Sequence, residues 1–168
     1  MCRAAVNIVG VGSTVMGDDG VGPVAIERLR ARGVPEGVRL HEAGLAVSDV
    51  LSTLDPAARL IVVDAVRAGG PAGTLYRFRL DPLAFGAADA AGMRRSLHEL
   101  SVGPALHLEA LAGRLFADVT VFGVEPAVVA WADKLSPAVA RAVGRLVDAI
   151  LDHIDARCAC TLAGDRSV

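Results

Sequence analysis

Along the chain, segments with the apolar pattern of a strand alternate with segments whose apolar residues recur at helical spacing. This pattern predicts strands and helices in turn. Residues 59–66 form a continuous apolar run, which is typical of a strand buried on both faces. Residues 74–80 alternate between apolar and polar, which indicates a strand with one wetter face. The same patterns predict further strands over residues 4–10, 38–42 and 118–123, and helices over residues 19–32, 47–54 and 101–115.

A long closing helix is predicted to begin after Ser136, a suitable cap, with Pro137 in its first turn. Apolar residues from Val139 to Ile154 then repeat at helical spacing and make one stripe. The stripe ends after Asp155, so we predict one α/β domain over residues 1–155 and a disordered tail over residues 156–168. Residues 81–95 contain glycines and a run of alanines, and we interpret them as a loop.

The alternation of strands and helices predicts an α/β fold of three layers. We expect a mostly parallel, twisted sheet of about five strands with helices on both faces. Right-handed crossovers place the carboxyl ends of parallel strands along one edge of such a sheet. Ligands bind outside that edge, at the point where the strand order reverses.

The composition narrows the class of function. The chain has 168 residues, 53% of them hydrophobic, and a formal net charge of −2, so no basic surplus points to nucleic acid or to an anionic membrane. No apolar run reaches the roughly 18 residues that cross a bilayer, and the N-terminus does not resemble a signal peptide. Three cysteines, Cys2, Cys158 and Cys160, favour reduced thiols and a cytoplasmic protein. The pair Cys158 and Cys160 is only a weak metal motif, because no second pair accompanies it.

Residues 6–23 organise the rest of the chain, because they run from an apolar strand through a glycine turn into two adjacent carboxylates, Asp18 and Asp19. A dinucleotide-binding fingerprint does not fit, since Val15 occupies the third glycine position. A phosphate-binding loop does not fit either, since the only lysine is Lys134 and the acidic pair would repel phosphate. As an alternative to a functional role, one of the two aspartates caps the following helix.

Three polar residues, Asp19, Asp64 and His98, follow predicted strands, so the fold rules allow them to meet in one crevice. Two carboxylates and an imidazole suit a divalent transition metal with open positions, and an aspartate pair alone suits the acid–base work of an aspartyl protease. The alternatives are that Asp64 bonds only to backbone amides and that His98 is an ordinary polar loop residue. The other histidines, His41, His107 and His153, are interpreted as structural.

The order of these motifs resembles that of the hydrogenase maturation proteases. The opening motif spans residues 10–23 (GVGSTVMGDDGVGP), and a second acidic motif spans residues 60–65 (LIVVDA). Ser96 and His98 resemble the family's histidine motif, and residues 122–126 (FGVEP) and 135–139 (LSPAV) resemble its last strand and closing helix. The resemblance covers residues 4–150, with two departures: Ser13 replaces a usual Asn, and Glu125 replaces a usual Gln.

The resemblance implies a parallel α/β endopeptidase that processes the large-subunit precursor of a [NiFe] hydrogenase. It implies that the enzyme recognises nickel already inserted in the precursor and then removes a short C-terminal extension. The family's catalytic and metal-binding residues fall on Asp19, Asp64 and His98. We therefore expect nickel carried by the substrate, with another divalent transition metal as an alternative, and no nucleic acid or membrane partner. The alternative function is a non-cleaving, metallochaperone-like module that binds the precursor.

Overall fold

The structure is a computed structural model that describes residues 5–83 and 102–163, with residues 157–163 described as backbone alone. Its strands are β1 (Val6–Val11), β2 (Val38–Gly44), β3 (Arg59–Ala65), β4 (Leu75–Leu80) and β5 (Val119–Val124). Its helices are α1 (Val21–Arg32), α2 (Val47–Thr53), α4 (Val102–Leu111) and α5 (Pro137–Ala163), and a short 3₁₀ turn, η1 (Gly17–Gly20), precedes α1.

The five strands form one sheet in the order β2-β1-β3-β5-β4. All neighbouring pairs are parallel except β4 and β5, which are antiparallel. From β1 the chain goes outward to β2, and from β3 it goes to the other side, so the strand order reverses between β1 and β3. The predicted α/β fold with a mostly parallel sheet is confirmed, and the reversal point marks the edge where a ligand is expected.

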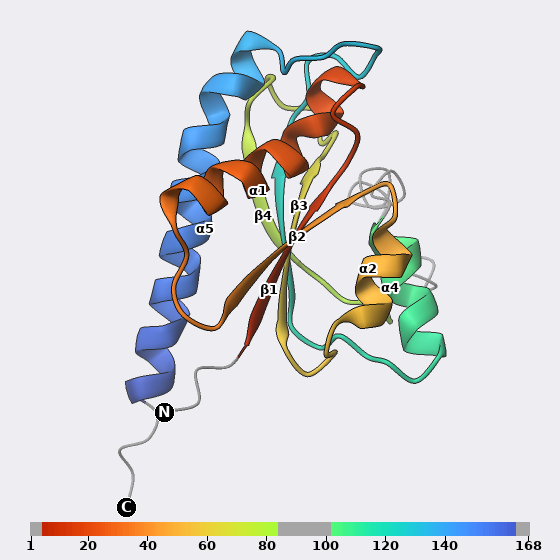
Figure 1. The fold of residues 1–168 in the computed structure, drawn as a ribbon, viewed down its shortest axis with the longest axis vertical. Helices are drawn as coiled ribbons and strands as arrows, with labels where there is room; N and C mark the ends of the chain where they lie inside the picture. The colour runs from red at the N-terminus through yellow and green to blue at the C-terminus, as the bar shows by residue number, and fades with distance from the viewer. Residues whose placement is uncertain (1–4, 84–101, 164–168) are drawn as a thin grey trace, which may run out of the picture.

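Helices cover both faces of the sheet, as Figure 1 shows. Because successive strand residues point to opposite faces, each buried strand supplies both cores. One core lies between the sheet and helices α1 and α5, and includes Ile8, Ile61 and Phe122. The other lies between the sheet and helices α2 and α4, and includes Val9 and Val62. This double burial explains why the sequences of β1, β3 and β5 are almost continuously apolar.

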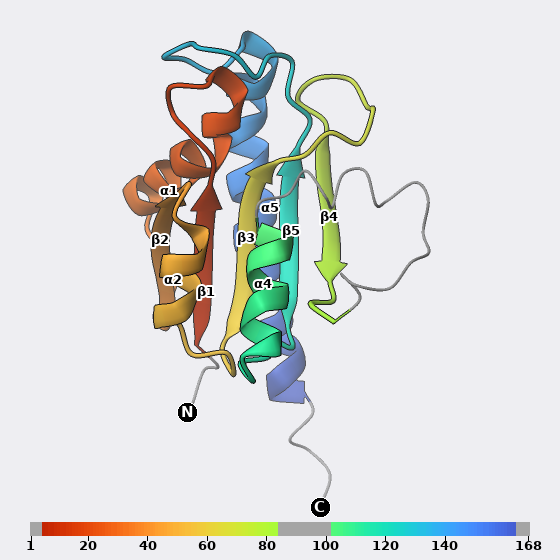
Figure 2. The ribbon, with the colours of Figure 1, turned by 90° about the vertical axis from the view of Figure 1, so that its right-hand side faces the viewer.

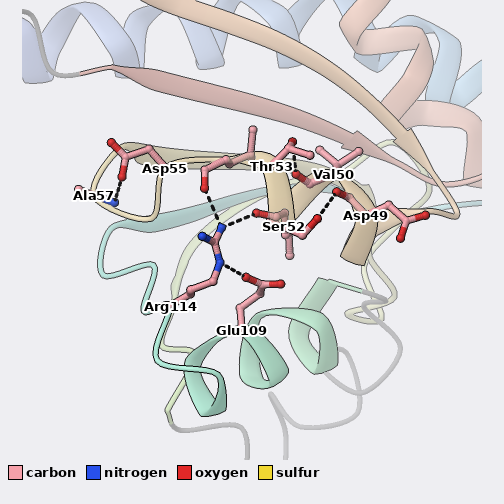
Figure 3. Close-up of polar contacts among 10 residues, drawn as sticks. Asp49, Val50, Ser52, Thr53, Asp55, Ala57, Glu109 and Arg114 are labelled. Atoms are coloured by element: carbon pink, nitrogen blue, oxygen red, sulfur yellow. Dashed lines mark hydrogen bonds and ion pairs between the residues drawn. The ribbon is translucent and has the colours of Figure 1, made fainter.

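Helix α4 ends at Leu111, earlier than the predicted end at residue 115. The chain beyond it turns so that Arg114 reaches the end of α2, where its guanidinium donates to the carbonyls of Leu51 at 3.1 Å and Leu54 at 2.8 Å (Figure 3). Glu109 accepts a further bond from Arg114 Nε at 2.6 Å. Arg114 thereby adds a donor to two carbonyls at the end of α2, where the Leu51 carbonyl also accepts from the Leu54 amide at 3.1 Å.

Helix α5 begins at Pro137, as predicted, and the Val139 amide lies 3.5 Å from the Ser136 hydroxyl in the expected cap arrangement. The helix does not end near Asp155 but is described as far as Ala163, so its end differs from the predicted one. The disordered tail over residues 156–168 stays a prediction. Among the residues of α5 whose side chains are described, Ile154 is the last one buried in the core. Among the described residues, none of the helices combines the length and apolar character needed to span a bilayer.

Candidate active site

Asp19 and Asp64 lie at the carboxyl edge of the sheet, beside the point where the strand order reverses. Asp64 is the penultimate residue of β3, and Asp19 lies in η1, which follows β1 at the upper edge in Figure 2. Asp64 is only 4% exposed, and its Oδ1 accepts a hydrogen bond from the Ala65 amide at 2.8 Å. Asp19 is half-buried, and its Oδ2 accepts a bond from the Ser13 amide at 2.7 Å.

The two carboxylates affect each other electrostatically. Burial raises the pKa of Asp64 to about 7; the bond from the Ala65 amide opposes this rise, and the negative charge of Asp19 adds to it. Asp64 thus holds a proton up to near-neutral pH. A cation between the two groups would remove their repulsion, so this pair has the oxygen donors and the electrostatic need that a metal site requires.

The turn before Asp19 depends on Gly12, whose φ is 110°. A side chain at this position would collide with the carbonyl oxygen of Asp19, so the backbone of the turn packs directly against η1. A cleft of about 340 Å³ opens beside this turn, between residues 12–14 and residues 42–45 at the end of β2. Gly12 thus packs against the backbone of Asp19 and also lines the cleft.

Asp18 has a different role from its neighbour. Its side chain is completely buried, and its carboxylate accepts three backbone hydrogen bonds from distant residues. The donors are the amides of Ala127 at 2.8 Å, Val128 at 2.9 Å and Ser136 at 2.6 Å. The predicted alternative of an aspartate cap is wrong, since the residue before α1 is Gly20 and no side chain caps that helix.

Asp18 remains ionised despite its burial. Burial raises the pKa of a carboxyl, but the hydrogen bonds from Val128, Ser136 and Ala127 outweigh it and hold the pKa of Asp18 below its usual value. A neutral carboxylic acid could not accept from all three amides as well as a carboxylate does. The buried charge is therefore compensated by the amides of the segment that connects β5 to α5, which we call the closing segment (residues 126–136).

Glu125 makes a comparable centre on the other side of the site. It is 7% exposed, and its Oε2 accepts bonds from the Tyr76 hydroxyl at 2.8 Å, the Ala68 amide at 2.8 Å and the Gly70 amide at 3.3 Å. Ala68 and Gly70 belong to the loop that follows Asp64. Burial raises the pKa of Glu125, but the bonds from Ala68, Tyr76 and Gly70 outweigh this and leave the pKa below its usual value.

These two centres connect three loops at the carboxyl edge, which Figure 2 shows side by side at the top of the sheet. The side chain of Glu125 holds the loop after β3, and the amides of Ala127 and Val128 hold the turn after β1 through Asp18. Sequence reasoning missed both roles. No local signal could reveal them, because the partners of Asp18 lie more than a hundred residues away along the chain.

His98 lies outside the described residues, so its predicted place beside Asp19 and Asp64 stays a prediction. The reasoning that put it there assumed that the preceding strand ends at the same edge. Strand β4 is antiparallel to β5 and ends at the opposite edge, so that part of the reasoning does not hold. Within the described ranges, no three His, Cys, Asp or Glu residues gather closely enough to bind a metal ion.

The remaining histidines occupy places that agree with the structural roles predicted for them. The His41 Nε2 atom lies 3.0 Å from Asn7 Oδ1, and the His107 Nδ1 atom lies 3.1 Å from the carbonyl of Pro82. The His153 ring packs edge-on against Phe122, with 5.6 Å between ring centres. The side chains of Cys2, Cys158 and Cys160 lie outside the described part.

The chain is similar to proteins of hydrogenase maturation. Residues 23–153 match the family model of the hydrogenase maturation protease HycI. The hydrogenase expression/formation protein HupM of Azotobacter chroococcum is 35% identical over 123 residues, which cover 71% of this chain and 56% of HupM. The chain thus spans little more than half the length of that relative.

Two solved structures have a similar fold. The hydrogenase 2 maturation peptidase from a Thaumarchaeota archaeon has a TM-score of 0.68 and 29% identity, covering 89% of this chain and 97% of the other. The hydrogenase maturating endopeptidase HybD from E. coli has a TM-score of 0.75 at 22% identity, covering 91% and 93%, and supports the fold alone. Given the family-model match over most of its length, the chain belongs to the hydrogenase maturation protease family.

Proposed function

We propose that this protein is an endopeptidase that removes a C-terminal extension from the large-subunit precursor of a [NiFe] hydrogenase after nickel insertion. Family membership supports the type of reaction and the type of partner. The observation that carries the proposal to this chain is the pairing of Asp19 with Asp64 at the edge where a ligand is expected.

Asp19, Asp64 and His98 are the residues that we propose to hold the nickel of the incoming precursor. The fit of the described pair is good, because two carboxylates that repel each other gain from a cation between them. Nickel also accepts imidazole, so His98 would complete the set, and a bound divalent ion supplies polarisation of a nearby carbonyl or water. Another divalent transition metal could occupy the same ligands.

Asp64 suits acid–base work in its own right. A group with a pKa of about 7 can take or give a proton near neutral pH, which is what hydrolysis of a peptide bond requires of a general acid or base. Asp19, half-buried and bonded to the Ser13 amide, is more exposed than Asp64, which is only 4% exposed. The proposal gives Asp19 the first contact with the precursor's metal.

The test is cleavage of a nickel-loaded precursor, followed by intact-mass spectrometry. We expect loss of the C-terminal extension with the wild-type protein and none from the nickel-free precursor. Asp19→Asn, Asp64→Asn and His98→Ala should each lower the rate by at least about a hundredfold, as is usual when a group that acts in the transition state is removed. Asp152→Asn, which changes an exposed acid on α5, is the matched control and should cleave normally.

The outcomes separate the two candidate functions. A stable complex with the precursor and no mass loss, whatever its metal content, would favour the non-cleaving binding module. Cleavage by His98→Ala at the wild-type rate would remove His98 from the proposal and leave the two aspartates. Equal cleavage of nickel-loaded and nickel-free precursor would overturn the role of nickel.

A further inference from the structure

Asp18 and Asp19 are neighbours on the 3₁₀ turn η1, and their side chains leave the turn in different directions. A 3₁₀ helix has about three residues per turn, so consecutive side chains are about 120° apart. Asp18 is completely buried and Asp19 is half-buried. Because both belong to one short turn, a contact that fixes Asp18 and the backbone of the turn also fixes the position from which the Asp19 side chain projects.

The backbone of the turn is bound to the closing segment as well. The amide of Asp18 donates to the carbonyl of Val128 at 3.0 Å, and the amide of Gly17 donates to the carbonyl of Ala132 at 3.0 Å. In return, the amide of Ala132 donates to the carbonyl of Val15 at 3.1 Å. The turn and the closing segment therefore lie against each other as paired backbones.

The Asp18 carboxylate joins the turn to the closing segment through side-chain hydrogen bonds as well. Its two oxygens bind amides from both ends of the closing segment, Ala127 and Val128 on Oδ2 and Ser136 on Oδ1. A side chain held at both oxygens cannot rotate without leaving a buried amide unpaired, which is costly. Asp18 is thus the only member of the acidic pair in η1 whose carboxylate joins the turn to the closing segment by the bonds described.

We infer that Asp18 is a positioning residue, whose carboxylate binds the closing segment and thereby directs Asp19 toward Asp64. The inference concerns the geometry of the turn, and its consequence for cleavage rests on the proposed function. The Ser13 amide offers a direct measurement, because it donates to Asp19 Oδ2 at 2.7 Å and touches neither Asp18 nor the closing segment by a described hydrogen bond.

The test compares Asp18→Asn with Arg114→Met. The first keeps the shape of the side chain but places an amide donor where only acceptors fit. The second removes two polar anchors at the end of α2, which precedes the start of β3 and so lies at the opposite edge of the sheet from η1. Both variants should lose stability, so an effect specific to Asp18 can be separated from destabilisation.

The first readout is the Ser13 amide, followed by NMR and hydrogen exchange in the folded protein. We expect its resonance to move and its exchange to quicken by about tenfold or more in Asp18→Asn, because Asp19 turns away and the bond is lost. Arg114→Met should leave this amide as in the wild type. An unchanged Ser13 amide in Asp18→Asn would overturn the inference, whether or not the protein cleaves anything.

The second readout is cleavage of the nickel-loaded precursor. Asp18→Asn should lower kcat by about tenfold to a hundredfold, because a misplaced catalytic group costs that much, while KM changes by less than about threefold. Arg114→Met should keep both constants at a temperature well below its Tm. A normal kcat together with a displaced Ser13 amide in Asp18→Asn would disprove the consequence for catalysis. A wild-type protein that does not cleave the precursor would overturn the proposed function, but the Ser13 result would still stand.

A milder variant keeps the test decisive if Asp18→Asn does not fold. Ser136→Ala removes the hydroxyl that also bonds to Asp18, but it keeps the Ser136 amide that donates at 2.6 Å. The Ser13 amide should move in the same direction and by less. If Ser136→Ala weakens stability and leaves the Ser13 amide unchanged, Asp18 has a structural role alone and the inference is wrong.

Discussion

The negative charge of Asp19 helps to raise the pKa of Asp64, its neighbour across the carboxyl ends of β1 and β3. Two acids that oppose each other in this way reduce the stability of the folded chain. Functional sites often retain residues that reduce folding stability. Replacement of one of the two acids with a neutral group removes the repulsion and should recover the lost stability.

Asp64→Asn is therefore expected to stabilise the protein while it abolishes cleavage. For an acid whose pKa is raised in the folded state, folding holds the extra proton between the unfolded and folded values, so stability falls as pH rises from about 4 to about 7. Asparagine keeps an oxygen that accepts from the Ala65 amide, and it does not titrate, so the variant should not lose stability over this pH range. We expect a gain on the order of 1–3 kcal/mol at pH 8 and little gain at pH 4, measured by urea unfolding.

The control is Asp152→Asn, an exposed change that should alter stability by less than about 0.5 kcal/mol at either pH. A loss of stability in Asp64→Asn at pH 8 would mean that the charge of Asp64 is compensated in the folded state. The electrostatic account of the pair would then be wrong.

Glu125 should show the opposite dependence on pH. Its folded-state pKa is lowered, so its ionised form contributes stability above the unfolded value of about 4.5, and this contribution is lost as the pH falls through the folded value. Glu125→Gln keeps an oxygen for the Tyr76 hydroxyl and the Ala68 amide but removes the charge. We expect a cost of about 1 kcal/mol at pH 7 that shrinks below pH 4, measured by chemical unfolding across that range.

Tyr76→Phe provides the matched partner for a double-mutant cycle, since it removes only the hydroxyl that donates to Glu125. If the two changes act on one bond, their effects at pH 7 should fall short of additive by about 0.5–1 kcal/mol. Fully additive effects, or a Glu125→Gln cost that persists at low pH, would contradict the charged hydrogen bond.

Gly22 is expected to tolerate no side chain. A Cβ there would meet the backbone of Val11 and, at 2.6 Å, the carbonyl oxygen of Val63, so α1 could not keep its close contact with β1 and β3. Gly22→Ala should cost about 2–4 kcal/mol by thermal unfolding, because backbone atoms cannot move aside as side chains do. Gly144→Ala is the control: its Cβ would meet nothing within 4 Å, and alanine should stabilise α5 by up to about 1 kcal/mol.

Arg114→Met should lower stability by about 1–3 kcal/mol, because the carbonyls of Leu51 and Leu54 lose the bonds from the guanidinium while the apolar stem is kept. The Leu51 carbonyl keeps its bond from the Leu54 amide. Glu109→Gln is the milder comparison, since it removes the charge that pairs with Arg114 at 2.6 Å and keeps an acceptor. We expect it to cost less than about 1 kcal/mol. A larger loss from Glu109→Gln than from Arg114→Met would show that the ion pair, and not the helix end, carries the stabilisation.

Much of the fold could be predicted because its causes are local in sequence. The apolar runs of β1, β3 and β5 follow from burial on both faces, and Gly33, with a φ of 85°, ends α1 as expected. The placement of Asp19 and Asp64 at one edge follows from the same rule, since Asp19 follows β1 and Asp64 lies near the end of β3, and these parallel strands are neighbours in the sheet. The direction of β4 could not be predicted, because alternation shows a wet face but not a strand's orientation.

The remaining differences have physical reasons that the local pattern does not contain. Helix α5 is described as far as Ala163, past the apolar stripe, because a helix that is already formed can be extended by one hydrogen bond per residue. One of the two aspartates was expected to cap the helix, because aspartate is a favoured cap, but the carboxylate of Asp18 accepts from three distant amides instead. Such long-range partners are visible only once the chain is folded.

The short stretch around Pro126 limits how this protein can be redesigned. Its residues serve both acids of the pair, through Glu125 toward the loop that follows Asp64 and through the amides of Ala127 and Val128 toward the turn that carries Asp19. An engineer who grafts a foreign connection between β5 and α5 must therefore reproduce these donors and acceptors first. Exchange of the outer residues alone, with those anchors kept, is the route that leaves the chemistry intact.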